Sequence, residues 1–242
     1  MDNNNRDNTN YLMVKTNIIR VSPGGLKGFY ILGILNYLRN HYVMNNYIYS
    51  GASAGAWNSL IMCSNRDNKF VNQFIDSLFV PISRSKSIEE IQYLFKHKLL
   101  DNFDSSDFDF SRLHIGVVTI KDRQVKTQIY TNFTDLTDAI ECCISSSHIP
   151  LITGKLVKNY RNNFVFDGGF SSNPYVKSSN YILHIEPNMW INKKDQKFIV
   201  NEFINNFSMS RNNPEQLYKT GYLDAIKNDN YFAHLKKLKK SN

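Results

Sequence analysis

The sequence is poor in cysteine and lacks any long hydrophobic run, and these absences exclude several classes of protein. Its three cysteines, Cys63, Cys142 and Cys143, show no metal-ligand spacing, because an adjacent pair cannot coordinate as a C-x-x-C motif does. Their odd number and helical setting indicate core packing in a reducing compartment. No apolar run approaches the roughly 20 residues that cross a bilayer as a helix.

The N-terminus also lacks a targeting signal. Its opening MDNNNRDNTN has no apolar stretch of the kind found in signal peptides. The polar composition instead predicts a flexible arm over residues 1–16. We therefore expect a soluble, intracellular protein, and peripheral contact with membranes stays open.

Positive charge is in excess, with a net charge of +8 at pH 7. Such an excess predicts an anionic partner, either nucleic acid or a membrane surface. No nucleic-acid recognition module is visible, so a transient contact with an anionic membrane is the favoured reading. The chain ends in a basic tail, residues 231–242, in which HLKKLKK spaces two leucines among lysines. This pattern is compatible with a helix on an anionic interface and equally with a solvated helix end.

Length and periodicity favour one α/β domain over residues 17–230. A chain of 242 residues can bury a sizeable core, and no repeat or linker divides it. Residues 17–21 and 47–49 are predicted strands, each followed by a loop and a helix, which is typical of a parallel sheet. The other predicted helices and strands are 29–42, 56–63, 69–79, 87–100 and 135–144 (helices), 113–120, 125–130, 163–166 and 181–185 (strands), and helices beyond residue 193.

The strongest functional signal lies in residues 47–60, YIYSGASAGAWNSL. Here G-x-S-x-G, formed by Gly51, Ser53 and Gly55, stands between a predicted strand and a predicted helix, which is the context of a nucleophile elbow. The tight turn requires small residues on both sides of the serine. It places the hydroxyl at a helix N-terminus, which favours negative charge. With only 11 glycines in the chain, roughly 0.05 matches to the G-x-S-x-G pattern are expected by chance. Ser53 is therefore the candidate nucleophile, and a turn with an N-capping serine is the alternative.

A glycine-rich loop follows the first predicted strand. Active sites of open α/β sheets lie at the carboxyl ends of strands, and consecutive glycines allow backbone N–H groups to converge on an anion. The loop is therefore a candidate oxyanion hole, although a tight turn or a phosphate nest has the same pattern. A P-loop is excluded by the spacing. The residues of this candidate hole are Gly24, Gly25, Leu26, Lys27 and Gly28.

A third motif, Asp167-Gly168-Gly169, directly follows the predicted strand 163–166. A carboxylate at this position could accept the proton of Ser53 if the two side chains meet. An ordinary Asp-Gly turn is the alternative.

These three motifs, in this order and spacing, resemble the patatin-like phospholipases. Further similarity is found in residues 146–150, in Asn173-Pro174 and in residues 221–225, so that the resemblance extends over residues 17–226. It implies a three-layer α/β/α fold with a central, mostly parallel sheet. It also implies a serine acyl hydrolase that cleaves carboxylic esters of phospholipids or related acyl lipids and needs neither a metal nor a cofactor. In that reading Ser53 is the nucleophile, Asp167 is its base, and the glycine loop supplies the oxyanion hole.

Two positions depart from the family pattern. Pro23 stands where the family usually has glycine, and proline has no N–H to donate. Lys27 stands where arginine is common, which keeps the charge but loses the bidentate fork. The missing donor motivates one alternative, a lipid- or membrane-binding protein that keeps the fold without turnover. A second alternative is a Ser-Asp-His esterase, whose histidine follows the aspartate in the chain and would be His184 or His234.

Overall fold

The computed structural model describes residues 17–121, 124–178, 181–190 and 212–239. The predicted N-terminal arm lies outside these residues. Among the described residues, no helix combines the length and the apolar character needed to cross a membrane.

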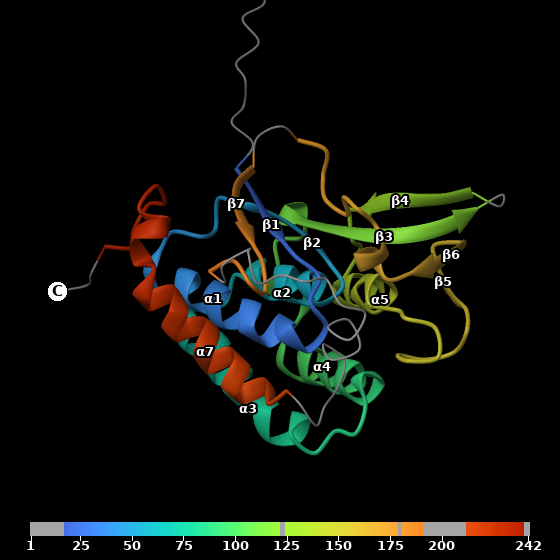
Figure 1. The fold of residues 1–242 in the computed structure, drawn as a ribbon, viewed down its shortest axis with the longest axis horizontal. Helices are drawn as coiled ribbons and strands as arrows, with labels where there is room; N and C mark the ends of the chain where they lie inside the picture. Colours follow the sequence, from blue (N-terminus) through green and yellow to red (C-terminus); the bar gives the residue numbers. More distant parts are fainter. Residues whose placement is uncertain (1–16, 122–123, 179–180, 191–211, 240–242) are drawn as a thin grey trace, which may run out of the picture.

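A seven-stranded mixed sheet forms the centre of the molecule (Figure 1), with the order β5-β6-β3-β2-β1-β7 and β4 paired to β3. Three of its pairings are parallel and join β7, β1, β2 and β3. The three antiparallel pairings join β3 to β4, β3 to β6 and β5 to β6. The strands are β1 (Ile18–Val21), β2 (Ile48–Ala52), β3 (Leu113–Lys121), β4 (Gln124–Tyr130), β5 (Lys158–Tyr160), β6 (Asn163–Phe166) and β7 (Tyr181–Ile185).

Helices flank this sheet, and the predicted three-layer α/β/α class is confirmed. They are α1 (Gly28–His41), α2 (Ala54–Met62), α3 (Asn68–Ile82), α4 (Ile88–Asn102), α5 (Leu136–Ser146) and α7 (Pro214–Lys227). Helix α1 follows β1 and α2 follows β2, as the alternation of strands and helices predicts. Figure 1 shows α7 lying along α1. Two hydrogen bonds tie these helices together, one from Tyr30 to Asp224 (2.9 Å) and one from Asn36 to Tyr218 (2.6 Å).

Helix α4 begins at a side-chain cap. The Ser87 hydroxyl accepts the Glu90 N–H at 3.2 Å. The Glu90 carboxylate accepts the N–H of Lys86 at 2.6 Å rather than that of Ser87. The reciprocal bond of a capping box is thus displaced by one residue. The three cysteines are unpaired and buried, which confirms their assignment to the core.

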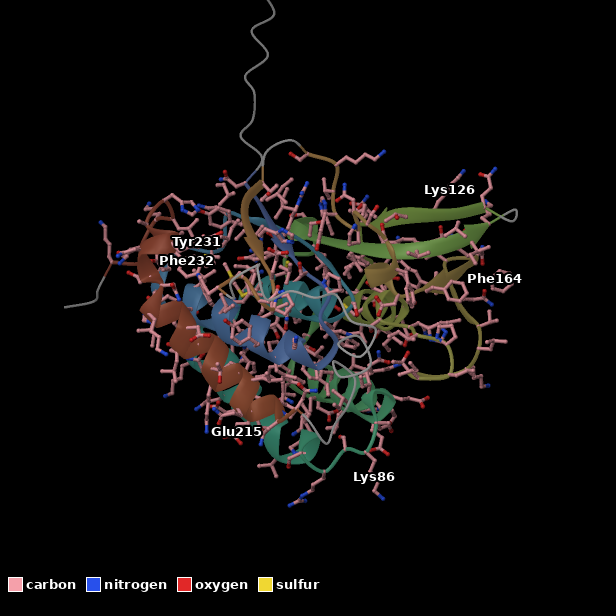
Figure 2. All side chains as sticks on the ribbon, in the orientation of Figure 1. Lys86, Lys126, Phe164, Glu215, Tyr231 and Phe232 are labelled. Carbon is pink, nitrogen blue, oxygen red and sulfur yellow. The ribbon has the colours of Figure 1, made fainter. Side chains whose placement is uncertain are left out.

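The described part of the basic tail is not helical, so the prediction of a helix there is wrong. After the 3-10 turn Asp229–Phe232, the chain runs in extended form beside the end of α1. The N–H of Val43 donates to the Lys236 carbonyl (2.8 Å), and the N–H of Leu238 donates to the His41 carbonyl (2.9 Å). Phe232 anchors this segment by full burial beside the exposed Tyr231 (Figure 2). These long-range pairings satisfy backbone groups that a helix would satisfy internally.

Candidate active site

Ser53 occupies a sharp turn between β2 and α2. Its φ of 53° and ψ of −128° lie in a region that L-residues other than glycine rarely adopt. The chain is so crowded here that a Cβ on Gly51 would stand 2.3 Å from the Gly55 carbonyl oxygen. A Cβ on Gly55 would stand 2.2 Å from the carbonyl oxygen of Val21. Glycine is therefore a steric requirement at both positions, as the G-x-S-x-G pattern predicts.

A serine from α5 holds this strained turn in place. The N–H of Ser53 donates to the Ser146 hydroxyl at 2.8 Å, and that hydroxyl donates to the Gly116 carbonyl at 2.7 Å. Both bonds are buried, and the Ser53 N–H would have no other described partner without Ser146. The side chain therefore couples the elbow to β3 and α5.

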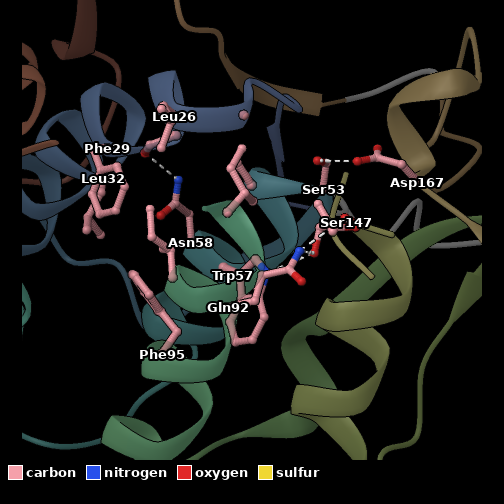
Figure 3. A pocket seen from close by; sticks show the side chains of 16 residues that line it. Leu26, Phe29, Leu32, Ser53, Trp57, Asn58, Gln92, Phe95, Ser147 and Asp167 are labelled. Atoms are coloured by element: carbon pink, nitrogen blue, oxygen red, sulfur yellow. Dashed lines mark hydrogen bonds between the residues drawn. The ribbon is translucent and has the colours of Figure 1, made fainter. Parts of the chain in front are cut away.

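Asp167 lies directly opposite the Ser53 hydroxyl, although the two residues are 114 positions apart in the sequence. The hydroxyl donates to Asp167 Oδ2 at 2.7 Å (Figure 3). The other carboxylate oxygen accepts the Gly169 N–H at 2.6 Å. The backbone of Asp167 is fixed as well, because its N–H donates to the His148 carbonyl at 2.8 Å. The carboxylate is thus oriented from both sides toward the serine.

Burial controls the acidity of this carboxylate. Asp167 is 4% exposed, and desolvation raises its pKa to about 6, against the opposing hydrogen bonds from Gly169 and Ser53. A carboxylate with such a pKa is ionised at neutral pH and is a stronger base than an exposed aspartate. It can therefore accept a proton from the hydroxyl that it contacts.

The glycine loop turns beside the pair as the 3-10 turn Gly25–Lys27, with Gly25 at a φ of 53°. Two of its N–H groups are occupied: that of Lys27 donates to the Gly24 carbonyl at 3.0 Å, and that of Gly28 turns back to the carbonyls of Gly25 and Leu26. Those of Gly25 and Leu26 make no hydrogen bond within the described residues. Of the five predicted loop residues, Gly25, Leu26 and Gly28 line the same pocket as Ser53 and Asp167, and Gly24 and Lys27 do not.

That pocket is mainly apolar. Figure 3 shows Leu26, Phe29 and Leu32 on one side and Trp57 and Phe95 below them, with the Ser53–Asp167 pair at the other end. Its polar side chains are engaged within the wall: the Trp57 indole and the Gln92 amide both donate to the Ser147 hydroxyl, at 3.1 and 2.9 Å. A chain of carbon atoms would therefore meet hydrocarbon surface along most of the pocket.

No histidine side chain joins the pair in the described residues. His184 Nε2 is 2.9 Å from the Ser22 hydroxyl and 3.3 Å from the Tyr175 hydroxyl, and its partners do not include Ser53 or Asp167. His234 is exposed in the C-terminal segment. The geometry thus brings together a Ser–Asp pair rather than the alternative triad.

Sequence reasoning missed the residues that support the site from other elements. Ser146 and Ser147 belong to the segment 146–150 and Trp57 to the stretch 47–60, but the sequence assigns none of them a role, and Gln92 lies outside every motif. Ser146 carried a usable signal, because a run of three serines at a helix end offers hydroxyls to a neighbouring turn. Gln92 carried none, because its position in α4 is remote in sequence from Ser53.

The family model of the patatin-like phospholipases matches residues 21–178. This is more than half of the chain, which therefore belongs to this family. Among solved structures, the crystal structure of VipD from Legionella pneumophila is similar with a TM-score of 0.34 and 12% identity. The match covers 70% of this chain and 49% of that chain, so this chain spans about half of VipD. The comparison with curated proteins found no match.

Proposed function

We propose that this protein is a lipid acyl hydrolase that cleaves carboxylic esters of phospholipids or related acyl lipids through Ser53 and Asp167. Membership of the patatin-like phospholipase family supports lipid acyl hydrolysis in general. The observation that carries the residue assignment is the 2.7 Å hydrogen bond between the Ser53 hydroxyl and the Asp167 carboxylate. It lies at the wall of an apolar pocket, where an acyl chain can leave water.

In the first half of the proposed reaction, Ser53 Oγ attacks the ester carbonyl carbon while Asp167 takes the hydroxyl proton. Negative charge then develops on the carbonyl oxygen. The N–H groups of Gly25 and Leu26 are the candidate donors to that oxygen, because both residues line the pocket and these groups have no other partner in the described residues. Collapse of the intermediate breaks the ester C–O bond, and Asp167 returns the proton to the departing alcohol.

In the second half, water replaces the alcohol. Asp167 takes a proton from the water molecule, whose oxygen attacks the acyl-enzyme carbonyl. The fatty acid leaves and Ser53 recovers its proton from Asp167. One carboxylate serves both halves, so no histidine is required.

Covalent trapping tests this assignment. A fluorophosphonate should form an adduct on Ser53 that mass spectrometry locates, and a chromogenic acyl ester should show a burst of released chromophore. Ser59→Ala is the matched control, because this second serine lies in α2 below the elbow and its buried hydroxyl has no hydrogen-bond partner in the part of the chain that the structure describes. It should label and turn over like the wild type. Vesicle binding without an adduct on Ser53 and without ester release would instead support a lipid-binding protein that lacks turnover.

A further inference from the structure

A second pocket, with a polar lining, lies at the amino end of β2, whereas Ser53 lies at its carboxyl end. It is formed by the loops that precede β2 and follow α2, together with Arg112 just before β3 and Leu238 of the C-terminal segment. Ser53 follows the carboxyl end of β2, whereas this pocket adjoins its amino end. The five residues of β2 separate the two by about 16 Å at 3.3 Å per residue.

The lining of this pocket is rich in hydrogen-bond donors with positive charge. It contains three arginines, three asparagines and a serine, and no aspartate or glutamate. These residues are Arg39, Arg66, Arg112, Asn45, Asn65, Asn68 and Ser64. Guanidinium and amide groups of this kind are the donors that proteins use for phosphate.

Arg39 is the central observation. Its side chain is 9% exposed, and no carboxylate forms an ion pair with it among the described residues. Nη1 and Nη2 donate to the carbonyls of Ser64 (3.1 Å) and Arg66 (2.5 Å), while the buried Nε has no partner in the described ranges. The Asp67 carboxylate acts on the Arg39 charge without forming an ion pair with it in the described residues. A buried cation that is only partly compensated is costly to the fold, so an anion in this pocket would stabilise the protein.

The other two arginines add charge at the same place. Arg112 is 7% exposed and donates to Asp109 at 3.2 Å and to the Met44 carbonyl at 3.4 Å. Arg66 is more exposed and pairs with Asp107 at 3.5 Å. These two carboxylates offset part of the charge of Arg66 and Arg112 but do not line the pocket, whose charged lining residues are all arginines.

The basic tail adds positive charge beside this pocket. Its described part runs past the pocket, where Leu238 contributes to the lining. Lys237 pairs with Asp229 at 2.8 Å. In the described ranges, Lys236 and Lys239 form no ion pair, so their charges add to those of the arginines.

We propose that the pocket lined by Arg39, Arg66 and Arg112 is a binding site for the phosphate group of a soluble ligand. The same chemistry could come from a lipid headgroup, but two features favour a soluble source. The central arginines are recessed rather than displayed on the surface. The pocket also lies at the amino end of β2 and Ser53 at its carboxyl end, so that one flat bilayer cannot reach both sites.

Thermal unfolding of the full chain in sodium phosphate and in sodium chloride of equal ionic strength tests the proposal. We expect phosphate at tens of millimolar to raise Tm by about 2–4 °C. Asn45→Asp should abolish this rise, because Asn45 is exposed and lines the pocket. Asn46→Asp is the matched control: it makes the same charge change one residue away, outside the lining. This control should keep the rise in Tm. Titration calorimetry at 0.15 M salt should show phosphate binding weakened by at most about twofold.

An equal loss in both variants would overturn the proposal, since it would show a general charge effect. An unchanged rise in Asn45→Asp would also overturn it, because phosphate would then bind elsewhere, for example at the glycine loop. Co-sedimentation with vesicles containing anionic phospholipid distinguishes a soluble phosphate ligand from a lipid headgroup. Vesicle binding that Asn45→Asp abolishes, without a response to inorganic phosphate, would show a headgroup site and contradict the soluble ligand.

Discussion

Ser146 accepts a hydrogen bond from the Ser53 N–H at 2.8 Å and passes one on to the Gly116 carbonyl at 2.7 Å. One hydroxyl therefore holds the strained residue that carries the candidate nucleophile. Because the Ser53 N–H has no other partner among the described residues, this contact supports both the fold of the turn and the position of the hydroxyl.

Ser146→Ala should lower both stability and turnover. It leaves the buried Ser53 N–H unpaired, which costs about 1–3 kcal/mol, and removes one hydrogen bond to the Gly116 carbonyl. The Ser53 hydroxyl would then be held less firmly, and kcat should fall by about tenfold or more with a smaller change in KM. Ser145→Ala is the control, because this neighbour is also buried but bonds the Glu141 carbonyl within its own helix. Ester hydrolysis and urea unfolding of both variants decide the matter; equal losses in the two would show that Ser146 does not position the elbow.

The pH profile should report the ionisation of Asp167. Burial raises its pKa to about 6, and only the ionised form can take the serine proton. We therefore expect kcat/KM to rise about tenfold per pH unit below pH 6 and to level off above it. His184→Gln should leave this inflection in place and keep activity within about tenfold, since His184 bonds Ser22 and Tyr175. Disappearance of the inflection in a folded His184→Gln variant would favour the triad.

The same carboxylate should cost the protein stability at neutral pH. Its pKa is about 6 in the folded state and near 3.8 when exposed, so the folded state binds more protons between these values. The unfolding free energy then falls as pH rises from about 4 to 6 and stays low above 6. Asp167→Asn removes this cost and retains an oxygen for the Gly169 N–H.

Asp167→Asn should therefore be inactive yet more stable than the wild type at pH 8, by up to about 3 kcal/mol. The advantage should vanish below pH 4. Denaturant unfolding at pH 4 and pH 8, with Ser53→Ala as the inactive control, measures this directly. The double variant should be little less active than either single one, because the two residues act as a unit. A destabilised Asp167→Asn at pH 8 would contradict the origin of the raised pKa.

Much of this arrangement could be predicted from local sequence. The elbow, the loop beside Pro23 and the Asp167 turn are each specified by a few adjacent residues, because glycine spacing and strand boundaries are local properties. The Ser146 bridge and Gln92 in the pocket wall depend on contacts between distant elements, which no spacing reveals. The tail was predicted as a helix from its leucine spacing, but pairing with residues 41–43 outweighs that propensity. The short strand β5 also forms only through its partner β6.

Pro23→Gly tests which N–H groups form the oxyanion hole. Pro23 lies against the Asp-Gly-Gly turn, since a Cβ on Gly169 would be 3.2 Å from its Cβ. If Gly25 and Leu26 supply the hole, the variant should change single-turnover acylation by less than about threefold. It should lose about 0.4–1 kcal/mol of stability, because glycine adds freedom to the unfolded chain. Lys27→Ala should also cost less than the two to three orders of magnitude expected for a lost donor, because it removes only a charge on a flexible stem and keeps every backbone N–H of the loop. A hundredfold faster acylation in Pro23→Gly would mean that the natural protein works with a donor missing at position 23, and that the hole does not rest on Gly25 and Leu26 alone.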